Sequence, residues 1–296
     1  MYFPAGREFM IERLAIIGVG LIGSSLALAL KQAGQVKQVC GYGRNPENLK
    51  RAISLGVIDE ACDSLKATVE GADMVVVAVP LGAMSSVFSE ILPWLEPQAV
   101  VTDVGSAKAS VVEAARHHLG QHFSRFVPGH PIAGAENSGV EAGLPELFKQ
   151  RRVILTPVEE TDKNAVERVA DMWLSCGAQV EYLETFHHDR VLAATSHLPH
   201  MLAFALVTHL SGLNEHEEIF RYAAGGFRDF TRIASSDPVM WRDVCISNGD
   251  ALVDLIENYK QELDLIVSAI KNDDGDQLLE LFGKSKAERD SLVGSC

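Results

Sequence analysis

Three glycines with a fixed spacing lie near the start of the chain, in the segment Gly18-Val19-Gly20-Leu21-Ile22-Gly23. An apolar run at residues 14–17 precedes them and a helical pattern at residues 21–33 follows. In such a segment the first glycine permits a tight turn, the second lets the backbone approach a pyrophosphate, and the third lets helix and strand pack closely. The helix N-terminus then faces the negative phosphates. The sequence therefore predicts a dinucleotide-binding turn formed by Gly18, Gly20, Leu21, Ile22 and Gly23.

The choice between NAD and NADP depends on the end of the second apolar run, at residues 39–42. A domain that prefers NAD places Asp or Glu about 20 residues after the glycines, where the carboxylate binds the ribose hydroxyls and repels a 2′-phosphate. Here Gly43 stands at the position expected for the acid, and Arg44 follows it. Because a guanidinium can pair with a phosphate, we expect NADP to be used at least as well as NAD. In the alternative, Arg44 stacks on adenine or points to solvent, and both cofactors are used.

Several histidines have positions suited to acid–base chemistry. His130 follows a short apolar run at residues 126–127, so it is expected near the carboxyl ends of the strands, where ligands bind. A neutral histidine accepts a proton readily near pH 7. His197 and His200 are three residues apart and would share one face of a helix. A metal pair with His187 or His188 is the alternative, but no cysteine or carboxylate cluster completes a four-ligand set, so we predict no metal.

The elements that must position these residues change in type along the chain. Up to about residue 183, continuous apolar runs alternate with amphipathic stretches, which indicates βαβ units around a buried, mainly parallel sheet. We therefore predict a doubly wound α/β Rossmann domain over residues 1–183, with Val79 and Pro80, at the end of one run, beside the cofactor. The predicted strands are residues 14–17, 39–42, 74–79, 100–104, 126–127, 152–155 and 179–183, and the predicted helices are residues 21–33, 48–55, 107–119 and 163–176.

The chain after residue 183 shows little strand signal, and we predict an all-α domain over residues 184–296. Apolar residues at helical spacing occupy residues 191–210, with Pro199 as a kink or break. Ser236-Asp237-Pro238 is a helix start, with a capping side chain and then proline in the first turn. A long amphipathic stretch follows at residues 239–270, Gly275 interrupts it, and residues 277–292 close the chain.

The bulk composition excludes several classes of protein. The formal net charge of −14 argues against nucleic acid and anionic lipid as partners, because both are negatively charged. The five cysteines have no zinc-finger or CxxC spacing, which favours free thiols in a reducing cytoplasm. Residues 14–30 imitate a signal peptide or membrane anchor, but three glycines interrupt them and they are shorter than the ~20 residues a spanning helix needs. No later segment is expected to span a membrane, so we expect a cytoplasmic protein.

Four further segments carry a family resemblance. They are Asp103-Val-Gly-Ser-Ala-Lys108, residues 129–136 (GHPIAGAE) with Ser138-Gly139, residues 196–200 (SHLPH), and residues 225–234 (GGFRDFTRIA) followed by Asp237-Pro238 and Trp241. Together they resemble the prephenate/arogenate (cyclohexadienyl) dehydrogenase family of tyrosine biosynthesis, from about Leu14 to at least Lys260. The second and third segments, in this order, are much more specific than the glycine motif.

The resemblance implies an oxidative decarboxylation with NAD(P). Hydride leaves C4 of prephenate for the nicotinamide, and the resulting ketone-like centre is conjugated with the ring. The ring carboxylate then leaves as CO2, because its electrons flow into that carbonyl and the ring becomes aromatic. The product is 4-hydroxyphenylpyruvate, or tyrosine when the substrate is arogenate.

The resemblance also implies catalytic roles. His130 matches the family's catalytic histidine, which accepts or polarises the proton of the 4-hydroxyl; a structural loop histidine is the alternative. The hydroxyl of Ser106 would hydrogen-bond the substrate or His130, although Ser106 could also cap the following helix. His200 matches a substrate-binding histidine. His197 is assigned to substrate binding as well, with a packed histidine on an apolar helix as the alternative.

A substrate with two carboxylates calls for a guanidinium, which offers a planar bidentate fork. Arg232 matches the family's substrate arginine, whereas we interpret Arg228 as a solvated surface charge. Glu136 and Asp229 match acids that neighbour this arginine and gate access, with an ordinary surface role as the alternative. The site would lie between the two predicted domains, and the resemblance implies a homodimer through the helical one.

Two other functions stay open at this point. One is a different oxidoreductase of similar layout, such as an imine reductase or a β-hydroxyacid dehydrogenase. The other is a non-catalytic dinucleotide sensor. The joint presence of Ser106, His130, His200 and Arg232 argues against both.

Overall fold

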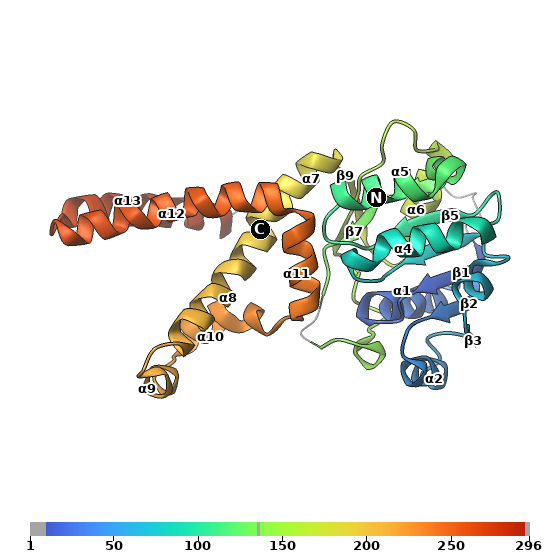
Figure 1. Ribbon diagram of the computed structural model, residues 1–296, viewed down its shortest axis with the longest axis horizontal. Helices are drawn as coiled ribbons and strands as arrows, with labels where there is room; N and C mark the ends of the chain where they lie inside the picture. The colour runs from blue at the N-terminus through green and yellow to red at the C-terminus, as the bar shows by residue number, and fades with distance from the viewer. Residues whose placement is uncertain (1–9, 135–136, 294–296) are drawn as a thin grey trace. The chain divides into compact units, whose positions relative to one another are not determined.

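The structure is a computed structural model that describes residues 10–134 and 137–293, with side chains described up to residue 291 (Figure 1). The chain forms two compact units, residues 1–249 and 250–296. The stretch 184–249 thus groups with the N-terminal part, and a domain boundary at residue 183 stays a prediction.

The first unit is built on a six-stranded sheet in which every strand is parallel to its neighbours. The strand order is β3-β2-β1-β4-β5-β6, so the chain reverses its direction of winding between β1 and β4. Ligands of such sheets bind outside the carboxyl ends of the strands at this switch point. The strands are β1 Ile11–Ile17, β2 Val36–Tyr42, β3 Glu60–Ala61, β4 Met74–Val77, β5 Val100–Asp103 and β6 Phe126–Val127.

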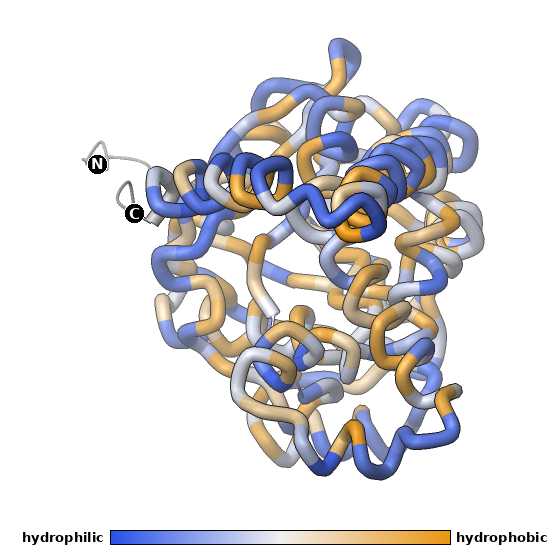
Figure 2. The backbone as a smooth tube through the Cα atoms, turned by 90° about the vertical axis from the view of Figure 1, so that its left-hand side faces the viewer, coloured by the Kyte–Doolittle hydropathy of each residue, from blue (hydrophilic) through white to orange (hydrophobic). Residues whose placement is uncertain are grey.

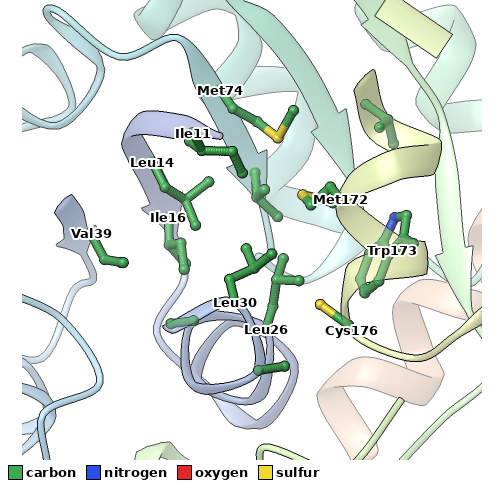
Figure 3. Packing of buried hydrophobic residues seen from close by; sticks show 14 of the residues in the cluster. Ile11, Leu14, Ile16, Leu26, Leu30, Val39, Met74, Met172, Trp173 and Cys176 are labelled. Carbon is green, nitrogen blue, oxygen red and sulfur yellow. The ribbon is translucent and has the colours of Figure 1, made fainter. Parts of the chain in front are cut away.

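Both faces of this sheet are buried, because alternate side chains of each strand enter different apolar clusters. Leu14 and Ile16 belong to one cluster, in which α1 (Leu21–Gln32) and α6 (Lys163–Ser175) cover the sheet (Figure 3). Ala15 and Ile17 belong to the other, which contains residues of α4 (Leu81–Ile91) and α5 (Ala109–His118). The predicted Rossmann architecture is therefore confirmed, including the continuous apolar strands that such burial requires.

A second sheet, with three strands, contains the candidate catalytic residue His130. Its strands are β7 Gly129–Pro131, β8 Arg152–Leu155 and β9 Gln179–Tyr182, in that order, and His130 lies opposite Ile154 in the antiparallel β7–β8 pair. The sequence analysis did not predict strand β7, in which His130 is the central residue. Three residues are too short to produce an alternating pattern, and only the pairing with distant β8 defines this strand.

The remaining helices of the Rossmann part include two that the sequence analysis did not predict. Helix α2 spans Pro46–Ser54, while α3 (Leu65–Val69) and α4 were missed. Helix α4 contains one charged residue and small polar side chains in place of a charged face, so its sequence lacks the contrast that marks a surface helix.

One continuous helical run follows β9. It consists of α7 (Thr185–Leu192), a π turn at Ala193–His197 and α8 (Leu198–Ser211). Pro199 does not break this run; it takes a place in the first turn of α8, directly after the π turn, where a missing N–H is tolerated. The π turn itself has no sequence signature, and such turns are frequent at functional sites.

The run Thr185–Ser211 is long and apolar enough to cross a membrane, judged by length and composition alone. The expectation that no segment after residue 30 meets these two criteria was therefore wrong. It holds the buried polar residues His188, Asp189 and His197, which a lipid-facing helix would not tolerate without partners. Most of its large apolar side chains are half-buried, and among them only Phe186 is exposed.

The first unit ends with short helices: α9 His216–Arg221, α10 Gly225–Thr231, the 3-10 turn Arg232–Ser235 and α11 Pro238–Ser247. Asp237 caps α11 by accepting a hydrogen bond of 2.8 Å from the backbone N–H of Met240, so the predicted helix start is confirmed. The predicted stretch 239–270 is divided at Asn248, which ends α11.

The second unit consists of α12 (Gly249–Lys271, whose first residue belongs to the first unit) and α13 (Gly275–Val293). Apolar and polar residues alternate along the helices nearest the viewer in Figure 2. On α12 a stripe of exposed apolar residues recurs every three or four positions, which places them on one face. This α12 stripe comprises Tyr259, Leu263, Val267 and Ile270.

Candidate active site

The glycine turn lies between the ends of β2 and β4. The N–H of Gly18 donates to the carbonyl of Tyr42 at 2.8 Å, and its φ of +105° is one that side-chain-bearing residues rarely adopt. A Cβ on Gly18 would lie 2.3 Å from the carbonyl oxygen of Ala78. The sequence therefore needs glycine here for two independent reasons, the backbone conformation and the close approach of β4.

The start of α1 is available for an anion. Gly20 is the N-cap residue and offers no side-chain hydrogen bond to the first turn, which Leu21 and Ile22 form. A Cβ on Gly23 would lie 2.3 Å from the carbonyl oxygen of Gly18, so only glycine lets the helix pack against the turn. This arrangement, a helix N-terminus at the β1–β4 switch point, is the geometry that holds a dinucleotide pyrophosphate. Val79 and Pro80 follow β4 at the same edge of the sheet.

The end of β2 leaves one cation available to a ligand. Arg44 is exposed and makes no hydrogen bond or ion pair within residues 10–134 and 137–293. Nearby polar side chains already make structural hydrogen bonds. Asn45 caps α2 by accepting from the N–H of Glu47, and the Asn48 amide donates to the carbonyl of Val19 at 2.8 Å. Gly43 precedes Arg44, so no carboxylate stands at this position.

A buried carboxylate joins the segments on either side of β6. One oxygen of Asp103 accepts from the N–H of Gly105 at 2.7 Å and from the ammonium of Lys108, and the other accepts from the N–H of Gly129 at 3.1 Å. The ammonium also donates to the carbonyl of Gly129 at 2.8 Å. Burial lowers the pKa of Lys108, and the Asp103 charge opposes that shift. This network sets the position of β7 relative to the loop that holds Ser106.

His130 is buried and connected to two residues of α7. Its Nδ1 lies 2.9 Å from Nε2 of His188, whose Nδ1 lies 2.8 Å from Oδ1 of Asp189. The pKa of His130 lies well below its usual value, mainly because of burial and further because of electrostatic interaction with His188, Lys108 and His197. His130 is therefore a neutral imidazole at neutral pH.

The Asp189 carboxylate also caps α5. It accepts from the backbone N–H groups of Lys108 at 2.7 Å and Ala109 at 2.8 Å. Burial opposes its ionisation, but the hydrogen bonds from His188 and from these two amides outweigh burial and lower its pKa. The N-terminus of α5 is thus capped by an acid that is distant in sequence, and the side chain of its own N-cap residue, Lys108, makes no capping hydrogen bond.

His197 and His200 lie beside the ring of Trp241. His200 stacks on it with centroids 3.8 Å apart, and His197 meets it edge-on at 6.0 Å. Burial lowers the pKa of His197 to about 4, and the nearby backbone of half-buried Ser106 raises it slightly. The amide of Asn248 donates to Nδ1 of His197 at 3.2 Å, while Nε2 is buried without a hydrogen bond among the described residues.

The substrate-arginine candidate, Arg232, lies near His200. Burial lowers the pKa of His200, and the charge of Arg232 lowers it further, so the two side chains are close. Nδ1 of His200 bonds the carbonyl of Ser196 at 2.8 Å. Asp229 is exposed on α10, one turn before Arg232, and Arg228 is exposed on the same helix. Glu136 lies outside the described residues.

The structure thus connects Lys108, His130, His188, His197, His200 and Arg232 through mutual charge effects. The sequence analysis missed the role of Asp189 and Asn248 and considered His188 only as a metal ligand. The adjacent pair His188-Asp189 is a weak signal, because its partners are more than fifty residues away. Within the described part of the chain, no three His, Cys, Asp or Glu side chains converge on a metal position.

Comparison with known proteins covers nearly the whole chain. A family model described as the prephenate dehydrogenase nucleotide-binding domain matches residues 26–182, and one described as the prephenate dehydrogenase dimerization domain matches residues 184–284. The cyclohexadienyl dehydrogenase of Zymomonas mobilis is 39% identical over 285 residues, which span 96% of this chain and 97% of that protein. The prephenate dehydrogenase of Bacillus subtilis is 38% identical over 286 residues, 96% of this chain and 76% of that protein.

Solved structures agree with these relatives. The prephenate dehydrogenase from Aquifex aeolicus, in complex with hydroxyphenyl propionate and NAD+, has a TM-score of 0.89 and 37% identity, with coverage of 97% of this chain and 100% of that one. The arogenate dehydrogenase of Synechocystis has a TM-score of 0.78 and 28% identity, with coverage of 95% and 99%.

The buried neutral histidines make stability depend on pH. His130 and His197 have folded-state pKa values below the unfolded value of 6.5, so between these values the unfolded chain binds more protons. Stability is then fully present above about pH 6.5 and decreases as pH falls, by up to about 1.4 kcal/mol per pH unit for each histidine. Urea unfolding between about pH 7.5 and pH 5 should show this slope. The slope of the unfolding free energy with pH should be smaller in His130→Asn, because one of the buried histidines is gone. The slope should be unchanged when the exposed His187 is replaced by Gln. Equal slopes for wild type and His130→Asn would contradict the assignment.

Proposed function

Because this chain belongs to the prephenate dehydrogenase family, we propose that it oxidises and decarboxylates prephenate, arogenate or both, with NAD(P) as hydride acceptor. It is an oxidoreductase of tyrosine biosynthesis with a nucleotide-binding Rossmann domain, and the resemblance of its four sequence segments to this family is confirmed. One observation carries the proposed mechanism: a buried, neutral His130 near the carboxyl edge of the sheet on which the glycine turn lies.

His130 accepts the proton of the substrate's 4-hydroxyl. NAD(P) held at the glycine turn would supply the acceptor for the hydride that leaves C4, and the O–H electrons of the substrate then form the carbonyl double bond. Loss of CO2 from the ring carboxylate sends its electrons toward that carbonyl and makes the ring aromatic. Ser106, between β5 and α5, hydrogen-bonds the hydroxyl or His130, and its proximity to His197 supports its place in the site.

The substrate carboxylates bind on the helical side of the site. Arg232 supplies the guanidinium, and His200 lies next to it. His200 is neutral alone, since burial and Arg232 both lower its pKa; a bound carboxylate offsets the Arg232 charge and favours the protonated ring. His197 completes the pocket wall beside Trp241. The family resemblance assigns Asp229 and Glu136 the role of gating access to the site.

The enzyme functions as a soluble cytoplasmic homodimer that assembles through its helical region. The match of residues 184–284 to a dimerization-domain model supports the dimer, as does the α12 stripe. Free thiols at Cys40, Cys62, Cys176 and Cys245 fit a reducing compartment.

Replacement of His130 tests the catalytic role. His130→Asn should fold, bind the cofactor and lose turnover by ~10²–10⁴-fold, which is the usual contribution of a general base. Steady-state kinetics with a parallel cofactor titration measures both quantities. A kcat within a few-fold of wild type would remove His130 from the mechanism.

Replacement of Arg232 tests the carboxylate anchor. Arg232→Gln should raise the substrate KM by roughly one to two orders of magnitude, because a charge-assisted hydrogen bond contributes ~1.5–3 kcal/mol, while cofactor affinity stays near wild type. Arg228→Gln, on the preceding turn, is the matched control and should change KM little. The reverse pattern would make Arg228 the anchor.

A two-by-two assay of prephenate and arogenate with NAD and NADP tests the activity and the cofactor together. NADP should give a kcat/KM at least equal to that with NAD, since no acid follows β2 and Arg44 is available to a 2′-phosphate. Arg44→Ala should lower the NADP value while nearly preserving the NAD value. A strong NAD preference would contradict the cofactor proposal, and tight cofactor binding without any turnover would favour a dinucleotide sensor.

Sedimentation analysis tests the dimer. The wild-type protein should have twice the mass of the 32.1 kDa chain. Leu263→Lys places a charge in the α12 stripe and should shift the population toward monomer, whereas Glu262→Lys, one position earlier and outside the stripe, should not. A monomeric wild type would refute the proposal.

A further inference from the structure

Two buried residues of α7 have no role in the function proposed so far. His188 is fully buried and Asp189 is 4% exposed, and together they join His130 to the N-terminus of α5. The inference drawn from them rests on the proposed role of His130 as proton acceptor. It concerns which of the two ring nitrogens of His130 is available for that role.

The direction of each hydrogen bond follows from Asp189. Its two oxygens accept from the backbone N–H groups of Lys108 and Ala109, so both act as acceptors and the group is an ionised carboxylate. The neighbouring Nδ1 of His188, 2.8 Å away, must then carry a hydrogen. With Nδ1 as the donor to Asp189, the other ring nitrogen of His188, Nε2, serves as the acceptor toward His130.

The same reasoning continues to His130. The acceptor Nε2 of His188 lies 2.9 Å from Nδ1 of His130, so this Nδ1 carries the hydrogen and donates it. Because His130 is neutral, its Nε2 then has a free lone pair. The nitrogen left free is thus the one that can accept a proton.

We propose that His188 and Asp189 are positioning residues that hold His130 in the tautomer with a bare, proton-accepting Nε2. When Nε2 takes the substrate proton, His130 becomes an imidazolium with a hydrogen on both nitrogens. Its Nδ1–H remains bonded to His188, which keeps its own hydrogen on Nδ1. No proton passes along the chain, and the ionised Asp189 stabilises the positive charge through His188.

The fold holds this chain from several sides. The antiparallel β7–β8 pair fixes the backbone of His130, and the amide of Asn248 donates to the carbonyl of Asp189 at 2.8 Å. The same Asn248 amide donates to Nδ1 of His197, so a neutral His197 carries its hydrogen on Nε2. The two buried histidines therefore have opposite tautomers, His130 as an acceptor and His197 as a donor.

The experiment compares three variants of His188 and its neighbours in the full-length protein. His188→Phe keeps a planar ring and removes the acceptor for His130. His188→Gln retains a carbonyl oxygen that can accept from Nδ1 of His130, so it is the conservative variant. His187→Gln is the matched control, because His187 is the preceding residue and is exposed.

We expect kcat to fall by roughly 100-fold in His188→Phe, to recover to within about tenfold of wild type in His188→Gln, and to be unchanged in His187→Gln. Substrate KM and the cofactor dissociation constant should change little in all three, since neither ligand touches His188. A kcat of His188→Phe within threefold of wild type would overturn the proposal, as would equal losses in the Phe and Gln variants.

A second readout needs no turnover and so separates this proposal from the proposed function. In nitrogen-15 spectra of histidine-labelled protein at pH 7, His130 should show a protonated Nδ1 and a bare Nε2, and His197 the reverse, with His130→Asn used for assignment. Asp189→Asn, which can donate to His188, should invert the His130 tautomer. A protonated Nε2 of His130 in the wild type would overturn the proposal. If the spectra agree but neither substrate is turned over, the proposed function fails and the tautomer control stands.

Discussion

The site depends first on a buried ion pair. Asp103 and Lys108 are both completely buried, and taking two charges out of water is costly unless each finds several partners. Here the N–H groups of Gly105 and Gly129 and the carbonyl of Gly129 supply them. The pair therefore does more than stabilise the core: it joins the loop of Ser106 to the strand of His130. It also places a positive charge near His130, which helps to keep that ring neutral.

The sheet places this pair where a ligand binds. Strands β1 and β4 are covered on both faces by apolar clusters, so their backbones are rigid, and the glycine turn follows directly from β1. Gly18 has no room for a side chain against β4. The next strand along the sheet, β5, ends at Asp103. The end of β1 thus positions the cofactor turn, and the end of β5 positions the buried ion pair, with β4 between them. The ion pair in turn holds the strand of His130.

Local patterns allowed much of this to be predicted from the sequence. The apolar strands, the glycine turn and the Asp237 cap are each marked by residues close together in the chain, so periodicity and spacing reveal them. Strand β7 and the His130–His188–Asp189 chain could not be predicted, because each depends on contacts between distant residues: His130 and His188 are 58 positions apart, and Asp189 and the Lys108 N–H are 81 apart. Pro199 was misjudged for a similar reason. A proline usually ends a helix, but here it follows a π turn, which has no recognisable sequence pattern.

The low basicity of His130 opposes its task, because burial lowers the pKa of the ring that must accept a proton. The chemistry of the substrate removes the conflict. An alcohol is far too weak an acid to give its proton to such a base, but once hydride departs, the same oxygen belongs to a protonated ketone, which is a strong acid. A weak, neutral base therefore takes the proton only as the hydride leaves, so the two transfers are coupled in time. A more basic histidine would be protonated, and hence inactive, at neutral pH; desolvation prevents this, and Asp189 then supports the positive ring at the moment it forms.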